Sequence, residues 1–417
     1  MIGDASLPPG FPPAPVGVME RGGVLYNSAS WTGDTLAALA RELARGRPSL
    51  LALSRSRLRS AWEGALTALL DASSPERATL DAPLTRLTRL SPAGLQAALE
   101  SVLGGALRGA GELFAAAQPA EDDRPVLIVL AGNLPALTVQ PLLPVLARRR
   151  PAILKSPSAE PLFAPALVAT LARREPALAG ALAAVTWKGG ERQIEDPLLA
   201  SVGTVLAYGD AASIESLQDR VPGRVIGYGP KTSLGVISRS VDPRSVAAGL
   251  ARDVALFDQR GCLSIQALYT AGDTAELADA LADALARVAA RWPPGPVDPA
   301  AAAGVHQLRA EAEMRGLYRP ELAIGAGTVV VEPLPDFRPS PGLRTVRIHP
   351  LPDLERLAEI LAPWNGKLQG AALAGAEAEA LAPALEALGV TRCARPGELQ
   401  SPNALWHNGG VHPLAVV

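Results

Sequence analysis

The fold is decided by residues 125–155, which read PVLIVLAGNLPALTVQPLLPVLARRRPAILK. The segment VLIVLA is wholly apolar, as expected of a strand that is buried on both faces of a sheet. PLLPVLARR then has the apolar spacing of a helix, and PAILK predicts a second buried strand. A strand, a helix and a strand in this order indicate parallel pairing, with the helix packed across the sheet.

The same alternation extends to both sides of this stretch. Further strands are predicted at AAVTW, TVLAY and RVIGY, and a second series begins after Lys231 with SLGVIS, IQALYT, TVVVE, LRTVRI and GAALAG. Residues 31–117 have helical spacing, residues 1–30 look irregular and proline-rich, and the final apolar run could pair with a sheet edge. GGALRGAG follows no strand, so it predicts helix packing and not a phosphate loop.

We therefore predict an α/β protein with two parallel-sheet domains. The expected parts are an N-terminal helical part of the cofactor domain (1–120), a dinucleotide-binding α/β core (121–232), an α/β domain that carries Cys262 (233–395) and a C-terminal tail (396–417). The usual glycine fingerprint of a dinucleotide loop is absent, so a standard Rossmann loop is not supported.

Composition excludes several classes of function. The net charge of −2 and the 4% aromatic content give no reason to expect nucleic acid as a partner. Two cysteines and four histidines indicate neither a disulfide framework nor a metal site. The longest apolar stretch is interrupted by prolines and is no membrane span, and the first residues have no signal-peptide pattern, so we expect a cytoplasmic protein.

Cys262, in LFDQRGCLSIQALYT, is the strongest candidate for a chemical role. It lies between a predicted helix and a predicted strand, where a thiol can be exposed and ionised. The alternative is a small buried apolar residue, but the polar cluster Asp258–Gly261 favours a nucleophile. Arg260 would either stabilise the thiolate or point to solvent. Cys393 has no such neighbours and is expected to be structural.

Other candidates follow predicted strands, at the edge where open α/β sheets bind ligands. Asn133 could donate to an oxyanion or cap a helix. Lys155 could reach a ribose or phosphate, or be a surface lysine. Gly209 and Asp210 could admit a ligand backbone and present a helix N-terminus, or form an ordinary turn. GYGPK, residues 227–231, could be no more than a tight turn.

The order of these elements resembles the aldehyde dehydrogenase superfamily, and the closer match is its LuxC-type acyl-CoA reductase branch. AGNLPA, ILKSPS, LAYGDAASIESL, YGPKTSLGVIS and DVALFDQRGCLSIQ carry the resemblance over residues 120–275, and WHNGG extends it at the C-terminus. The resemblance implies that Cys262 accepts the acyl group and that Asn133, with the Cys262 backbone N–H, forms the oxyanion hole. It also implies that Lys155 and Ser158 contact the adenosine ribose, and that Gly209 and Asp210 line the cofactor cleft. The fold that it implies is α/β and aldehyde-dehydrogenase-like, with two parallel-sheet α/β domains and the active site in the cleft between them.

Two departures from the superfamily sharpen the expected activity. Hydrolytic members have a water-activating glutamate where GYGPK has none, so an acyl-cysteine should persist for reduction. Many NAD-preferring members have a glutamate where this chain has Ser158, so we expect NADPH, with NADH as the alternative. Glu332 is only a distant candidate for the glutamate near the nicotinamide ribose.

The resemblance thus implies a reductase that converts an acyl-CoA or similar acyl thioester to an aldehyde. The alternatives are an aldehyde dehydrogenase in the oxidative direction and a non-catalytic scaffold for an acyl-transfer complex. The acyl donor could also be an acyl-transfer partner enzyme, and we expect a homo-oligomer. His407 and Asn408 are expected to end a strand rather than to touch substrate.

Overall fold

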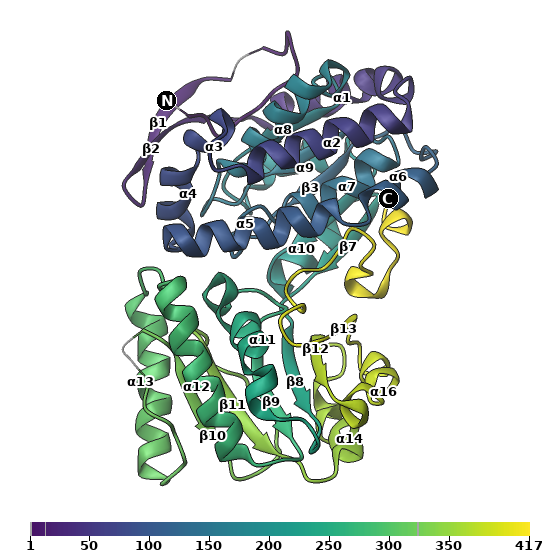
Figure 1. The fold of residues 1–417 in the computed structure, drawn as a ribbon. Helices are drawn as coiled ribbons and strands as arrows, with labels where there is room; N and C mark the ends of the chain where they lie inside the picture. The colour runs from purple at the N-terminus through teal and green to yellow at the C-terminus, as the bar shows by residue number, and fades with distance from the viewer. Residues whose placement is uncertain (1, 13, 323–324) are drawn as a thin grey trace.

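Two parallel β-sheets, one above the other in Figure 1, organise the computed structural model, which describes residues 2–12, 14–322 and 325–417. The first sheet has the strand order β5-β4-β3-β6-β7. Its strands are β3 (Val126–Val129), β4 (Ala152–Lys155), β5 (Leu182–Val185), β6 (Thr204–Tyr208) and β7 (Arg224–Tyr228). The second sheet has the order β10-β11-β9-β8-β12-β13. Its strands are β8 (Thr232–Ile237), β9 (Ile265–Thr270), β10 (Thr328–Val331), β11 (Thr345–Pro350), β12 (Leu368–Ala374) and β13 (Arg392–Ala394).

Helices cover both faces of the first sheet. Leu127 and Ile153 pack on one face, and their neighbours Ile128 and Leu154 pack on the other, as alternation along a strand requires. One face meets α1 (Gly33–Leu51), α9 (Arg192–Leu199) and α10 (Ala211–Arg220). The other meets α2 (Arg55–Leu70), α5 (Pro92–Leu107), α6 (Ala110–Ala116), α7 (Val139–Ala147) and α8 (Phe163–Arg174), with α3 (Pro75–Ala78) and α4 (Asp81–Thr88) beyond them. The doubly covered α/β architecture is confirmed.

The second sheet is covered in the same way. One face packs on α11 (Pro243–Ala255) and α12 (Thr274–Arg291), and α13 (Pro299–Met314) lies beside them in Figure 1. The other face packs on α14 (Leu357–Leu361), α15 (Ala376–Glu379) and α16 (Ala382–Ala387). The first sheet lies within residues 126–228 and the second within 232–394. The predicted division into domains agrees in outline with these limits but stays a prediction.

The predictions for the two ends of the chain were wrong. Residues 1–30 are not irregular throughout, because β1 (Val16–Arg21) and β2 (Val24–Ala29) form an antiparallel hairpin. Gly22 and Gly23 close it with φ of 56° and 74°, a left-handed turn that suits glycine. The last apolar run forms a 3₁₀ turn at Pro413–Ala415 and not an edge strand.

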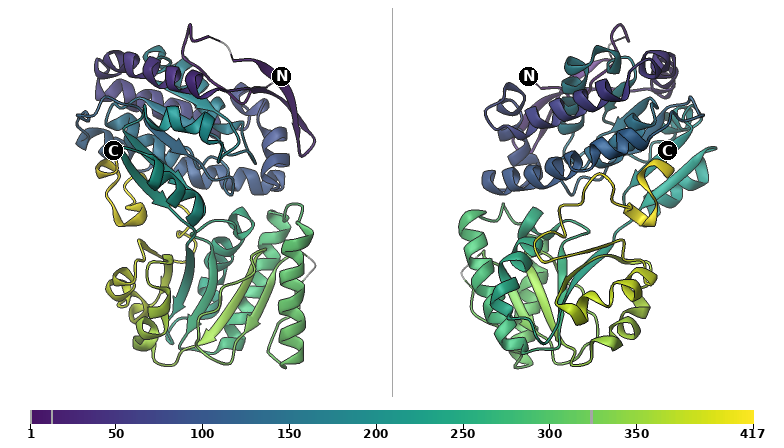
Figure 2. Two further views of the ribbon diagram at one scale, coloured as in Figure 1. Left: turned by 180° about the vertical axis from the view of Figure 1, so that it is seen from behind. Right: turned by 45° about the vertical axis from the view of Figure 1, so that its right-hand side comes forward.

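The C-terminal segment instead returns to the first sheet and its helices (Figure 2). The Arg224 guanidinium donates to the Ala415 carbonyl, and the Arg148 side chain donates to the Val417 carbonyl. The Ala404 backbone N–H donates to the Arg108 carbonyl at the end of α5. The segment therefore bridges the two sheets. None of the helices in the described ranges has an apolar stretch long enough to span a bilayer.

Candidate active site

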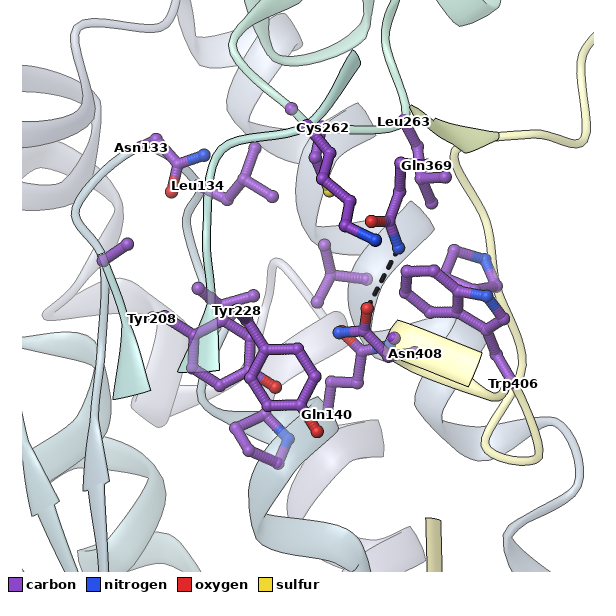
Figure 3. A pocket seen from close by; sticks show the side chains of 18 of the residues that line it. Asn133, Leu134, Gln140, Tyr208, Tyr228, Cys262, Leu263, Gln369, Trp406 and Asn408 are labelled. Atoms are coloured by element: carbon purple, nitrogen blue, oxygen red, sulfur yellow. Dashed lines mark hydrogen bonds between the residues drawn. The ribbon is translucent and has the colours of Figure 1, made fainter. Parts of the chain in front are cut away.

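A cavity of about 600 Å³ lies where the two sheets face each other. Its walls include Asn133, Tyr208, Lys231, Cys262 and Gln369, which come from both sheets (Figure 3). Residues 402–416 of the C-terminal segment supply a third wall. Of the six predicted site residues, the cavity brings together Cys262, Asn133, Gly209 and Asp210, whereas Lys155 and Ser158 are not part of its walls.

The first sheet contributes its carboxyl edge to the cavity, as predicted. Val129 at the end of β3 is level with Lys155 on β4 and Ala207 on β6. The loops after these strands therefore leave from one edge. The second sheet contributes its amino edge, because Lys231, Cys262 and Gln369 lie just before or at the first residues of β8, β9 and β12. Open α/β sheets usually bind ligands at the carboxyl ends of their strands, so the use of the amino edge of the second sheet could not be predicted from that rule.

The turn at residues 257–264, called the nucleophile turn after the role that the sequence predicts for Cys262, begins in an unusual backbone conformation. Phe257, Asp258 and Gln259 follow α11 with φ of 59°, 50° and 64°, a left-handed region that costs a non-glycine residue on the order of 1 kcal/mol. Asp258 is fixed by an ion pair of 2.7 Å with Arg344. The Gln259 side chain accepts from the Thr345 N–H and donates to the Thr345 and Ile265 carbonyls. These buried bonds hold the strained turn against the second sheet.

The C-terminal segment secures the same turn through Gln400, a buried residue. Its amide nitrogen donates to the Asp253 and Leu256 carbonyls at the end of α11. Its amide oxygen accepts from the Ser264 hydroxyl at 3.1 Å, and that hydroxyl accepts from the Gly261 N–H at 3.2 Å. A Cβ on Gly261 would approach the Gln400 side-chain oxygen to 2.9 Å, so a larger residue there would displace the Gln400 amide. The nucleophile turn is thus held from both sides.

Burial raises the pKa of the Cys262 thiol to about 11, although the backbone N–H groups of Cys262 and Leu263 and the charge of Lys231 act to lower it. Arg260 neither faces the sulfur nor points to solvent. Its guanidinium donates to the Phe257 carbonyl at 3.0 Å and to the Thr88 carbonyl at 2.6 Å. Arg260 therefore neither stabilises the thiolate nor points to solvent, the two alternatives that the sequence left open. It instead ties the turn to the backbone at Thr88.

Asn133 lies across from the nucleophile turn and is exposed in the cavity (Figure 3). It does not cap a helix, since α7 begins at Val139. Its side-chain nitrogen donates to the Arg260 carbonyl at 3.0 Å, which joins the two sheet edges directly. An amide nitrogen carries two hydrogens, so one remains for a further acceptor.

Lys155 and Ser158 lie at the same sheet edge but outside the cavity. The Lys155 ammonium is 5.1 Å from the centre of the Trp187 ring, and burial lowers its pKa while Glu195 acts to raise it. No carboxylate in the described ranges is within ion-pair distance of Lys155. Ser158 is exposed in the following turn. Lys155 is therefore packed against an aromatic ring, not a freely solvated surface lysine.

Gly209 and Asp210 follow β6 at the cavity wall. The Asp210 carboxylate accepts from the Ser213 N–H at 2.7 Å and so caps α10, which lowers its pKa. A Cβ on Gly209 would meet only the Ser213 side chain, at 3.6 Å, so the backbone there is open to close approach. GYGPK is no tight turn, because it carries the chain from β7 in the first sheet to β8 in the second.

Sequence reasoning missed two features of the cavity. Tyr208 and Tyr228 stack with ring centres 4.5 Å apart, and burial raises the pKa of Tyr228 to about 12. Asn408 does not end a strand; it lines the cavity and accepts from the Gln369 amide at 3.0 Å (Figure 3). The tyrosines at the ends of TVLAY and RVIGY were a usable signal, because neighbouring parallel strands that end level bring them together.

Glu332 is not part of this site. It is buried after β10, at the opposite edge of the second sheet, and forms ion pairs with Arg347 and Arg315. Among the residues that the structure describes, no three histidine, cysteine or acidic side chains are placed to hold a metal ion.

The amino-acid sequence of the chain is similar to that of a known protein family. The family profile described as acyl-CoA reductase (LuxC) matches residues 71–417, which is most of the chain. The chain belongs to the LuxC family. Two curated relatives are long-chain acyl-protein thioester reductases, from Aliivibrio fischeri, with 26% identity over 257 residues, and from Photobacterium leiognathi, with 27% identity over 154 residues. These matches span 58% and 36% of this chain, but only 54% and 32% of the relatives' own length.

Solved structures confirm the fold of this LuxC-family chain. A putative aldehyde dehydrogenase from Burkholderia cenocepacia has a TM-score of 0.74 at 15% identity, over 99% of this chain and 93% of that one. An NADP-dependent enzyme from Escherichia coli has a TM-score of 0.72 at 17% identity, over 94% and 90%. The predicted aldehyde-dehydrogenase-like fold is therefore correct.

Proposed function

We propose that the protein reduces an acyl thioester to an aldehyde through an acyl group carried on Cys262. The observation that carries the proposal is the position of Cys262 in a cavity whose one lining carboxylate, among the described residues, is Asp210. That carboxylate caps α10 and has a lowered pKa, so it is a weak base. The cavity thus offers a nucleophile without a group that activates water, as the sequence of GYGPK suggested.

The acylation step follows from the groups around the sulfur. The Cys262 thiolate attacks the thioester carbonyl carbon, the new S–C bond forms, and the donor's C–S bond breaks as its thiolate leaves. The developing oxyanion is held by the second hydrogen of the Asn133 amide and by the Cys262 backbone N–H. Pre-oriented donors of this kind are the largest contributors to many acyl-transfer reactions. Asn133 is fixed for this role by its bond to the Arg260 carbonyl.

A nicotinamide cofactor fits the edge of the first sheet. Lys155 presents a cation without an acidic partner there, and Gly209 leaves its backbone accessible. Lys155 and Ser158 would hold the adenosine ribose, and Gly209 and Asp210 would lie along the cleft that leads to Cys262. When bound, the reduced cofactor would supply a hydride to the acyl carbon, and the C–S bond would break so that the aldehyde leaves and the Cys262 thiolate is restored.

The preference for NADPH is supported by the serine at position 158, which carries no carboxylate. The nearest one in sequence, Glu160, is buried and accepts from the Leu162 and Phe163 N–H groups at the start of α8. Its carboxyl group is therefore buried against the start of α8, whereas Ser158 is exposed. A 2′-phosphate would find the Lys155 ammonium, and Ser158 offers no carboxylate to repel it.

The acyl chain is assigned to the apolar side of the cavity. Helices α5 and α7 and the C-terminal segment line it with Val102, Ala106, Leu137, Leu143, Val411 and Val416. A volume of about 600 Å³ is in the ordinary range for small-molecule sites. The donor itself, an acyl-CoA or an acyl-protein, would stay outside the cavity and insert only its acyl chain.

Mass spectrometry of the protein after incubation with acyl-CoAs of graded length, without cofactor, tests the nucleophile and the donor together. An acyl mass on the peptide that contains Cys262 is the expected result. The same experiment with an acylated partner protein distinguishes an acyl-protein donor from acyl-CoA. Absence of an adduct with every donor would refute the proposal, and rapid aldehyde oxidation without CoA would favour the oxidative dehydrogenase.

Replacement of Ser158 by Glu tests the cofactor assignment separately. Binding of NADPH, followed by quenching of tryptophan fluorescence, should weaken by about tenfold or more relative to NADH, because a carboxylate repels the 2′-phosphate. S158A is the matched control and should change little. Equal weakening of both cofactors in S158E would contradict the assignment.

A further inference from the structure

We propose that Lys231 is a positioning residue for the nucleophile, with its ammonium group acting as the counter-ion of the Cys262 thiolate. The proposal rests on the assignment of Cys262 as the acyl-accepting residue. It adds an electrostatic partner that the sequence did not single out, since GYGPK was considered only as a turn that lacks a glutamate.

Strand geometry brings the two residues together. Lys231 immediately precedes β8, and Cys262 precedes β9, the neighbouring parallel strand. The Ser233 hydroxyl, near the start of β8, donates to the Cys262 carbonyl at 2.8 Å, which fixes the nucleophile turn against the start of that strand. Both side chains line the same cavity.

The charges in the cavity single out Lys231. The titratable or charged groups of its walls, within the described residues, are Asp210, Tyr208, Tyr228, Arg260 and Lys231, besides the thiol itself. Burial keeps both tyrosines protonated near neutral pH, and Asp210 caps α10. Arg260 is bound to two backbone carbonyls.

Lys231 is half-buried and has no carboxylate within ion-pair distance in the parts of the chain that the structure describes. A cation without an acidic partner beside a thiol is an arrangement that favours the thiolate. The Cys262 thiol loses its proton to solvent, and Lys231 acts only through its charge. The positive charge of Lys231 acts to lower the pKa of the Cys262 thiol, whereas the burial of the sulfur raises it.

Alkylation of Cys262 by iodoacetamide tests this pairing without acyl donor or cofactor. The rate at each pH from 7 to 10, followed on the Cys262 peptide by mass spectrometry, reports the thiolate fraction. Lys231→Met should slow alkylation about three- to tenfold below pH 9, because one pKa unit corresponds to a tenfold change in thiolate. Lys231→Arg should restore the rate to within about twofold.

The chain offers matched controls. Lys367 immediately precedes β12, the other strand beside β8, but its ammonium lies 5.8 Å from the Trp364 ring and it is not in the cavity wall. Lys367→Met should therefore leave Cys262 alkylation unchanged. Cys393, the second free cysteine, is an internal reference whose alkylation reports any general loosening of the fold.

Two results would overturn the proposal. One is an unchanged pH profile in Lys231→Met with an unchanged Cys393 rate. The other is equal slowing by Lys367→Met. Neither would affect the acyl-cysteine assignment, which the acyl-adduct experiment decides independently. A faster Cys393 reaction in Lys231→Met would mean that the fold has loosened. The Lys231→Arg variant then decides, because the proposal is also overturned if this variant does not restore the alkylation rate of Cys262.

Discussion

The two sheet edges that meet at the cavity are built in different ways. On the first sheet, Asn133, Ser158 and Asp210 are exposed and lie in loops that simply leave the strands. On the second, Cys262 follows three left-handed residues that are held by buried hydrogen bonds from Asp258, Gln259 and Gln400. One edge is open to a ligand, and the other fixes a single sulfur. The difference suggests that binding and chemistry are divided between the edges, and the following experiments test that division.

The largest effect is expected at the fixed edge, from Cys262→Ser. A serine hydroxyl is a far weaker nucleophile than a thiolate when no base activates it, so aldehyde formation should fall by at least about 10³-fold. Aldehyde release and acyl-adduct mass spectrometry measure the loss. Cys393→Ser, on β13, should remain active, and comparable activity in C262S would refute the covalent route.

The next effect is expected where the open edge reaches the fixed one, at Asn133. Asn133→Ala removes an oxyanion donor, and the rate of acylation should fall by about 10²–10³-fold. Stopped-flow release of the CoA thiol measures acylation directly. Asn365→Ala, in an exposed turn outside the cavity, is the control. A normal acylation rate in N133A would show that Asn133 is no oxyanion donor and that its role is limited to the hydrogen bond with the Arg260 carbonyl.

A smaller effect is expected from Gln400→Leu, which leaves the Ser264 hydroxyl and the Asp253 and Leu256 carbonyls without their partner. Loss of buried hydrogen bonds should lower the free energy of unfolding by about 1–3 kcal/mol. We expect the acylation rate to fall as well, by about tenfold, because the turn loses its support. Urea unfolding and single-turnover acylation measure the two quantities. Loss of stability without any change in acylation would show that the C-terminal segment does not position the nucleophile.

The smallest effect on activity is expected at Glu160, which lies behind the open edge. Burial raises the pKa of this carboxyl from 4.5 to about 7. The native state therefore binds the proton more tightly than the unfolded chain. The stability that results is complete below about pH 4.5 and is lost as the pH rises through 7.

Glu160→Gln removes the titrating group, so the change of the free energy of unfolding with pH should shrink by up to about 3 kcal/mol. The fold should be kept, because the amide oxygen can still accept from the Leu162 and Phe163 N–H groups. Urea unfolding at pH 5, 6 and 8 measures the difference between wild type and variant. Acylation at pH 7 should stay within about twofold. Parallel pH curves for the two proteins would contradict the assignment of a raised pKa to this group.

The sequence was sufficient to predict most of the elements around the cavity. Short apolar runs such as VLIVLA and PAILK predicted buried strands because both of their faces are covered by helices. The polar cluster before Cys262 forms the turn that brings the cysteine to the cavity, and the chemical role inferred from that cluster stays a prediction. The hairpin at Val16–Ala29 was missed because Gly22-Gly23 was not read as a turn signal.

Hydrophobic periodicity and turn chemistry are local, so the order of strands and helices and the residue types at the strand ends can be inferred from the amino acids alone. The packing of the two sheets is not local. It sets the amino edge of the second sheet against the carboxyl edge of the first, which brings Lys231 and Asn133 to the same cavity as Cys262. Tertiary packing also decided that Gln400, far along the chain, holds the nucleophile turn. Such contacts depend on how the two sheets and the C-terminal segment pack together, and no local pattern encodes that packing.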